Sequence, residues 1–167
     1  NGYEFRNYGE SGGHSLGLVT AFAESKISPG SIWIGSFGTG LNRFANGNIT
    51  IQQESLLVGK QFFAMFEDAT GSLWCGTQDG LYVIDPTLRS PSTRILDGYI
   101  HDVVESGDGH IWVATENVVN VFSRKREKLT RLEMKGYRAG RADRMLASHD
   151  GSVWIATDSG TVLQFRD

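Results

Sequence analysis

Four histidines are the residues best suited to acid–base or metal chemistry in this chain: His14, His101, His110 and His149. A metal site or a nucleophile–base pair needs its members within a few ångströms of one another. The strand order derived below places His110 and His149 on turns at one rim of the molecule and His101 at the opposite rim. We therefore predict no catalytic residue, no metal site and no cofactor. The single thiol, Cys75, is interpreted as a small core residue.

A second group of residues has the chemistry of a ligand site. We assign Thr20, Phe63, His101 and Arg144 to one aligned position of the repeat described below, near the start of each innermost strand. Loops that converge at the same channel mouth add Gln78, Asp79, Glu116, Asn117 and Asp158. An aromatic ring, an imidazole, a guanidinium and side-chain amides suit a small polar ligand such as an oligosaccharide. The alternative, that these residues only line a wet channel, remains open.

The repeat is carried by one short motif around all four tryptophans. Successive tryptophans are 41, 38 and 42 residues apart, and their surroundings read GSIWIGS, GSLWCGT, GHIWVAT and GSVWIAT. A glycine three residues before each Trp indicates a tight turn with positive φ, where a Cβ would be strained. The sequence is therefore a single domain over residues 1–167 whose repeats are centred on Trp33, Trp74, Trp112 and Trp154.

Each Trp strand is apolar on both faces. Trp74 and Gly76 alternate with Leu73 and Cys75, so that a small sheet containing them must be covered on both sides. Sheets stacked radially against copies of themselves meet this need, as the blades of a β-propeller do. The small residue two positions after each Trp leaves room for the neighbouring blade. We predict an all-β propeller of about four blades of four antiparallel strands, with the tryptophans in the core.

The strands of these blades follow from the register of the motif. Innermost strands are expected at Leu18–Glu24, Phe62–Glu67, Ile100–Glu105 and Asp143–Ala147. Third strands are expected at Leu41–Phe44, Leu81–Ile84, Val118–Phe122 and Thr161–Phe165, and weaker fourth strands at Ile49–Gln53, Thr93–Leu96 and Lys128–Glu133. Residues 1–9, with Tyr3–Tyr8, are expected to be the outer strand of a preceding blade or of a closing last blade. A closed four-bladed ring and a piece of a larger ring both fit this pattern.

Charge and composition narrow the classes of partner. The net charge of −3 and the isoelectric point near 5.8 disfavour nucleic acid as a partner, because such binding needs a surplus of Lys and Arg on one face. No run of apolar residues reaches the length of a membrane-spanning helix. In a piece of a larger ring, the apolar flanks of the end blades would be uncovered and would favour self-association.

One repeat resembles a known family in particular. Glu67-Asp68 before the turn, Gly71-Ser72-Leu73-Trp74-Cys75-Gly76-Thr77 through it and Asp79-Gly80-Leu81-Tyr82 after it resemble the two-component regulator propeller repeat. This resemblance implies a segment of a propeller, usually of seven blades, in the periplasmic or extracytoplasmic sensor of hybrid histidine kinases and related receptors. Several members of the family respond to products of polysaccharide breakdown. Neighbouring propeller or signalling domains are implied as partners.

The resemblance favours a non-catalytic module that senses a ligand or docks a neighbouring domain. Two other classes remain open. Streptogramin-type lyases are also propellers with a Gly-x-aliphatic-Trp repeat, but they need a catalytic histidine and a metal at the channel mouth, where only His101 is placed. A purely structural interaction scaffold would have no small-molecule pocket. The identity of the ligand, the number of blades in the intact ring and the output domain lie beyond the sequence.

Overall fold

The computed structural model describes residues 3–8, 15–52, 55–85, 87, 90–134 and 140–166. In this part of the chain, fifteen strands form four antiparallel sheets, and the helical structure is the single 3-10 turn η1 (Ser55–Leu57). None of the described helical structure is long and apolar enough to cross a membrane. The molecule is all-β, as the repeat predicts.

The four sheets, which we call blades 1 to 4, follow the chain in order. Blade 1 contains β1 (Gly17–Glu24), β2 (Ile32–Gly38), β3 (Gly40–Ala45) and β4 (Asn48–Ile51). Blade 2 contains β5 (Phe62–Glu67), β6 (Leu73–Thr77), β7 (Gly80–Ile84) and β8 (Thr93–Asp97). Blade 3 contains β9 (Ile100–Glu105), β10 (Ile111–Thr115), β11 (Val118–Phe122) and β12 (Lys128–Glu133). Blade 4 contains β13 (Ala142–Ala147), β14 (Val153–Thr157) and β15 (Val162–Phe165).

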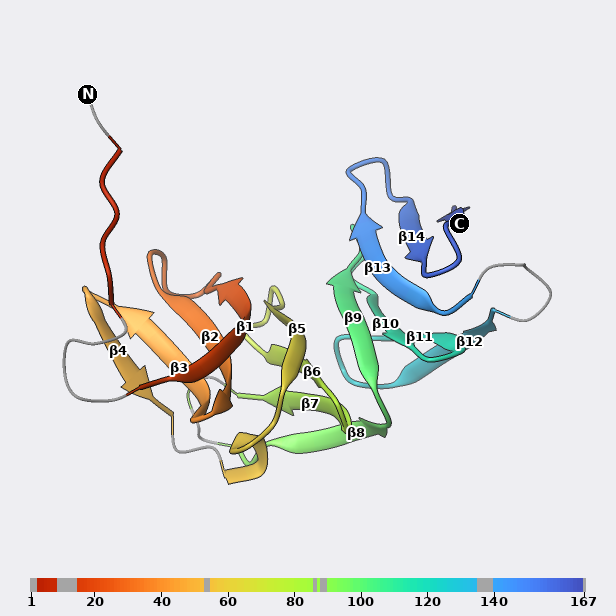
Figure 1. Ribbon diagram of the computed structural model, residues 1–167. Coiled ribbons are helices and arrows are strands. Elements are labelled where there is room, and N and C mark those ends of the chain that lie inside the picture. Colours follow the sequence, from red (N-terminus) through yellow and green to blue (C-terminus); the bar gives the residue numbers. More distant parts are fainter. Residues whose placement is uncertain are drawn as a thin grey trace.

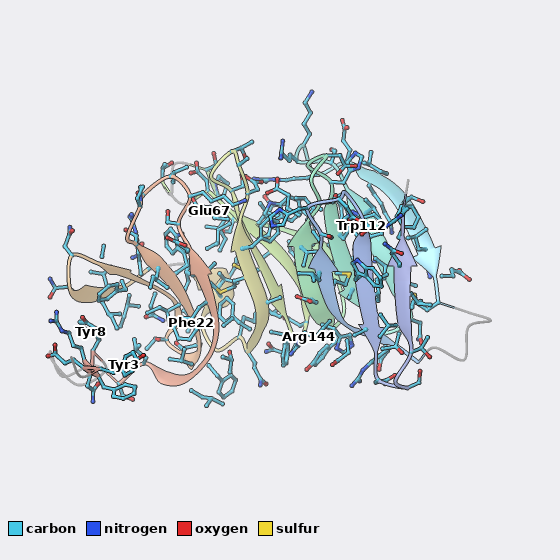
Figure 2. All side chains as sticks on the ribbon, turned by 90° about the horizontal axis from the view of Figure 1, so that it is seen from above. Tyr3, Tyr8, Phe22, Glu67, Trp112 and Arg144 are labelled. Carbon is cyan, nitrogen blue, oxygen red and sulfur yellow. The ribbon has the colours of Figure 1, made fainter. Side chains whose placement is uncertain are left out.

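The blades succeed one another along an arc, with the first strand of each blade against the first strand of the next (Figure 1). β1 contacts β5, β5 contacts β9 and β9 contacts β13. All first strands run in the same direction, so the blades share two rims. We call the end where first strands begin the mouth rim and the end with the turns between first and second strands the turn rim. Figure 2 shows Arg144 and Glu67 at these opposite rims.

The turns that precede the tryptophans have the predicted geometry. Gly30, Gly71, Gly109 and Gly151 have φ angles of 80°, 86°, 85° and 84°. In blade 2, the carboxylate of Asp68 accepts hydrogen bonds from the backbone N–H of Thr70 and Ser72, at 2.8 and 3.0 Å. A glycine is required at this position because side chains with a Cβ rarely adopt such a φ. The motif therefore encodes the hairpin that brings each Trp strand back across its blade.

Side chains from facing blades form three core clusters. Trp33 of blade 1 joins Phe62 and Leu73 of blade 2, and Trp74 joins Ile100 of blade 3. The third cluster links Trp112 to blade 4. Each buried Trp thus faces the following blade.

The small residues after the tryptophans let these blades approach. A Cβ on Gly35 would lie 2.6 Å from Cγ of Phe62, and one on Gly76 would lie 2.7 Å from Cγ2 of Ile100. Real Cβ atoms do not come this close to carbon, so any side chain at either position would push the blades apart. The close spacing of blades inferred from the motif is confirmed.

The fourth tryptophan differs from the other three. Trp33, Trp74 and Trp112 are buried, as expected, whereas Trp154 is 38% exposed. Its side chain points to the side of blade 4 on which the described chain places no further sheet. The prediction that all four tryptophans are core residues is therefore wrong for Trp154, because its motif faces a blade that this arc does not contain.

The first described residues also depart from expectation. Tyr3–Tyr8 form no strand, and no described segment completes blade 4 beyond β15. In the structure, this segment does not close a four-bladed ring. The segment instead lies at the blade 1 end of the arc (Figure 2), where the ring of Tyr8 meets that of Phe44 at 4.8 Å between centroids. Its assignment to a preceding blade stays a prediction.

Candidate functional site

Each innermost strand begins with a β-bulge at the mouth rim. The pairing of first and second strands skips one residue between Val19 and Ala21, between Phe62 and Ala64, between Ile100 and Asp102 and between Ala142 and Arg144. The skipped residues are Thr20, Phe63, His101 and Asp143. A bulge re-aims the side chain of the extra residue and is common at the rims of barrels and beside functional sites. Every blade therefore contributes one re-aimed side chain to the same rim.

Arg144 does not occupy this shared position, which corrects the sequence prediction. It pairs with Ala156, whereas Asp143 is the skipped residue of blade 4. Phe63 and His101 each stand eleven residues before their Trp, and in blade 4 the same spacing leads to Asp143. Arg144 is nevertheless close by, because its guanidinium donates to the backbone carbonyl of His101 at 3.2 Å. The bulge position of blade 4 therefore carries the carboxylate of Asp143, and the guanidinium of Arg144 lies next to it.

Two of the bulge residues belong to a stack of three rings. The centroid of the Tyr99 ring lies 4.4 Å from that of Phe63 and 4.6 Å from that of His101. Tyr99 directly precedes β9 and remains 37% exposed, while His101 is only 6% exposed. The stack joins blade 2 to blade 3. It offers an aromatic surface on the mouth rim.

The surroundings of His101 favour the neutral form of its imidazole. Burial lowers its pKa, and the nearby charge of Arg141 lowers it further. No described residue supplies a hydrogen-bond partner for its Nε2, nor for the buried Oγ1 of Thr20. A buried polar atom without a partner costs about 1–3 kcal/mol. Two of the four equivalent bulge residues contain such an atom. Packing alone therefore does not explain which residue types stand at the mouth rim.

Gln78 and Asp79 are already engaged in holding the rim together. The side chain of Gln78 accepts a hydrogen bond from the backbone N–H of Gln61 at 2.6 Å. Asp79 forms an ion pair with Lys60 and accepts from Thr77 Oγ1 at 2.8 Å. Burial alone would raise the pKa of Asp79, but the hydrogen bonds from Lys60 and Thr77 outweigh it and lower the pKa. These two residues tie the loop between second and third strands to the start of β5.

Asp158 repeats this arrangement in blade 4. Its carboxylate accepts from the backbone N–H of Arg141 at 2.9 Å and lies 3.4 Å from the guanidinium of the same residue. Glu116 and Asn117 are exposed in the loop between β10 and β11. Among the predicted loop residues, Glu116 and Asn117 are the two for which we observe no side-chain contact that connects segments across the rim. The structure therefore separates the predicted set into rim ties and exposed groups.

Asp102, the residue after His101 in β9, links blade 3 to blade 4. One carboxylate oxygen accepts from the backbone N–H of Met145 at 2.7 Å, and the other accepts from that of Val103 at 2.9 Å. Burial raises the pKa of Asp102, against the effect of these two hydrogen bonds. This half-buried contact joins β13 to β9. It thereby positions Asp143 and Arg144 beside His101.

The other described histidines lie at the turn rim, as predicted. His110 pairs with Asp108, with 2.7 Å between Nδ1 and Oδ2, and His149 is exposed in the turn before β14. His14 lies outside the described residues. In the described part of the chain, no three His, Cys, Asp or Glu side chains are grouped so that they could hold a metal ion. Cys75 is buried in the core, as expected.

The mouth rim can therefore offer the exposed part of the Tyr99 side chain and both signs of charge, from Asp143 and Arg144. Sequence reasoning found Phe63 and His101 but missed Tyr99 and Asp143. The signal for Tyr99 was its position two residues before His101, which places the two side chains on the same side of an extended chain. The signal for Asp143 was the constant spacing to the tryptophan.

Comparison with protein families gives one match, which lies mainly in blade 3. The family model described as "Two component regulator propeller" matches residues 94–117, which run from β8 through β10 and include Trp112. The chain carries a two-component regulator propeller repeat. The resemblance read from the blade 2 motif is thus confirmed on the neighbouring blade. Among curated proteins, none matches this chain significantly.

Solved structures show the same fold as this two-component regulator propeller repeat and its neighbours. The extracellular domains of two hybrid two-component systems of B. thetaiotaomicron match with TM-scores of 0.75 and 0.74, each at 16% identity. They cover 97% and 96% of this chain, which spans 23% of each of theirs. PorZ of Porphyromonas gingivalis, a surface component of the type-IX secretion system, matches with a TM-score of 0.65 at 17% identity, over 86% of this chain and 24% of its own. The four blades match about a quarter of the length of these larger propeller domains.

Proposed function

We propose that this chain is part of a ligand-sensing propeller in the extracytoplasmic region of a two-component signalling receptor. The two-component regulator propeller repeat at residues 94–117 is the observation that carries this proposal. The likeness to extracellular domains of hybrid two-component systems supports it at the level of the fold. In this role the propeller is not catalytic, and the signal passes to neighbouring domains of the receptor.

The ligand site we propose is the mouth rim around Tyr99. Tyr99 is 37% exposed, and the part of its side chain that Phe63 and His101 leave uncovered would contact a sugar ring, while flanking polar groups would orient the sugar hydroxyls. Asp143 accepts and Arg144 donates hydrogen bonds, and a guanidinium also suits an acidic group. The ligand class that fits these groups is a small polar molecule such as an oligosaccharide.

Calorimetric titration with a panel of neutral and acidic oligosaccharides tests this function. We expect Tyr99→Ala to weaken binding by about fivefold or more, since contact with an aromatic side chain contributes on the order of 1 kcal/mol. Arg144→Ala should weaken acidic ligands more than neutral ones. Ile27→Ala is the matched control, because Ile27 is an exposed apolar residue in the turn between β1 and β2, at the opposite rim.

Other outcomes of the same titration would identify the other two classes. Conversion of a bound ligand, detected by mass spectrometry and lost in His101→Ala, would favour a lyase-like enzyme. Absence of binding across the panel, with binding to an isolated neighbouring domain of a receptor, would favour a scaffold.

A further inference from the structure

His101 contains a buried polar atom that the fold leaves without a partner. The residue is 6% exposed, and its buried Nε2 finds no hydrogen-bond partner among the described residues. Most buried side-chain polar atoms in proteins are paired, and an unpaired one lowers stability. The presence of a histidine at this position therefore calls for an explanation other than the stability of the fold.

The fold itself does not need a histidine at this position. His101 is the residue that the strand pairing skips in blade 3, and Phe63 is the skipped residue of blade 2. The rings of both residues stack on Tyr99. A phenylalanine is thus accommodated at the equivalent place in the neighbouring blade. In place of His101 it would keep an aromatic contact with Tyr99 and remove the unpaired nitrogen.

The lack of a partner is not due to an uncovered blade face. β9, which contains His101, contacts β5 of blade 2 on one side and β13 of blade 4 on the other. The imidazole is therefore in the interior of the arc, with a blade on each side. What remains open to it is the mouth rim.

The charged groups around the imidazole favour an uncharged ligand atom at Nε2. Burial lowers the pKa of His101 most, and Arg141 and Arg144 lower it further. Asp143 and Glu116 act in the opposite direction. Positive and negative side chains thus face the imidazole in equal number. A neutral imidazole has one nitrogen that donates and one that accepts, and a hydroxyl group can do both without adding a charge.

A ligand reaches Nε2 from the mouth rim by moving a side chain. Tyr99 stacks on the imidazole, and Arg144 donates to the backbone carbonyl of His101 at 3.2 Å. Both side chains are exposed, and Figure 2 shows Arg144 at this rim. Side-chain rotamers commonly change when a partner binds. Displacement of either side chain therefore gives a path to the nitrogen without a change in the backbone.

We propose that Nε2 of His101 is the atom that recognises a hydroxyl group of the ligand. This inference rests on the proposed ligand-sensing function and specifies its chemistry at one point, a neutral sugar hydroxyl beside Tyr99. The hydrogen bond made in the complex supplies the partner that the fold does not. His101 is then a specificity-determining residue, which lowers the stability of the free protein and contributes to binding.

Unfolding and binding measured on the same variant test this proposal. At neutral pH, His101→Phe should raise the denaturant midpoint of the free protein, because the unpaired nitrogen is removed. The same variant should bind neutral oligosaccharides about fivefold or more weakly in calorimetric titration, because it lacks the hydrogen bond. His101→Gln, which keeps a group that donates and accepts, should bind more tightly than His101→Phe. His110→Phe is the matched control and should bind normally, since His110 pairs with Asp108 at the turn rim.

Deoxygenated sugars identify the hydroxyl. The probes are the neutral oligosaccharide of the panel that binds most tightly and its monodeoxy forms. Loss of the recognised hydroxyl should weaken binding to the wild-type protein about fivefold and should have little effect on binding to His101→Phe. This cycle between ligand and protein isolates the one interaction that the proposal assigns.

Other outcomes separate this inference from the proposed function. Absence of binding to the wild-type protein across the panel would overturn the proposed function and this inference together. Equal binding by wild type and His101→Phe would overturn the role of His101 alone, and the partner of Nε2 would then be water. Weaker binding together with a lower denaturant midpoint in His101→Phe would also overturn it, because the histidine would then be a structural residue.

Discussion

The indole N–H of Trp33 donates a hydrogen bond to Glu67 of the next blade, with 3.0 Å between Nε1 and Oε2. Trp74 and Trp112 instead donate to residues of the turns in their own blades, Asp68 at 2.8 Å and Ser106 at 3.0 Å. The turn in blade 1 is two residues longer, and the hydroxyl at its start, on Ser25, accepts from the backbone of Ser28. Its tryptophan therefore finds a partner across the blade interface.

Glu67→Ala should lower the free energy of unfolding by about 1–3 kcal/mol, because the buried N–H of Trp33 loses its acceptor. Glu67→Gln keeps an oxygen in place and should retain most of the stability. Denaturant unfolding measures both variants. The same Glu67→Ala change in a Trp33→Phe background should cost less. Equal damage by Gln and Ala would contradict the role assigned to this hydrogen bond.

Two equivalent tryptophans should differ in their contribution to stability. Trp74→Ala empties a fully buried position and should cost about 3–5 kcal/mol. Trp154→Ala should cost less than about 1 kcal/mol in the monomer, because the indole is on the uncovered face. Thermal or denaturant unfolding at low protein concentration compares them. Similar losses would mean that the indole of Trp154 is covered in solution.

Gly76→Ala tests the close approach of blades 2 and 3. The added methyl group would meet Ile100, and overpacking of this kind costs about 1–3 kcal/mol. Gly107→Ala is the matched control, since nothing lies within 4 Å of a Cβ there, and it should change stability by less than about 0.5 kcal/mol. A double variant with Ile100→Ala, which removes the Cγ2 atom that the methyl group meets, should lose less stability than the sum of the two single losses. The free energy of unfolding of these variants decides the point.

The pH dependence of stability should report His101. Its pKa is lowered in the folded protein, while an unfolded histidine titrates near about 6.5. Below that pH the unfolded chain binds the proton more readily, so the free energy of unfolding should fall as the pH falls from about 6.5 toward the lowered pKa. His101→Phe keeps an aromatic ring and should reduce this dependence. An unchanged slope between neutral pH and about pH 5.5 in the variant would show that other groups cause it.

The sequence by itself determined the repeat, the turns and the strands. Phe62–Glu67, Ile100–Glu105 and Lys128–Glu133 have the bounds that the motif register predicted, because turn glycines and alternating apolar residues act locally. The family resemblance was equally available, since it rests on the same local motif.

Tertiary structure alone decided what each repeated residue faces. Trp74 and Trp154 share the same local motif, yet only Trp74 is buried, because burial depends on whether another blade covers the indole. The bulges that aim His101 and Asp143 at the mouth rim, and the stacking of Tyr99 between two blades, are likewise products of strand pairing and blade packing. The local sequence pattern determines the fold of each blade. The blades packed against it determine which of its side chains stay exposed and can bind a ligand.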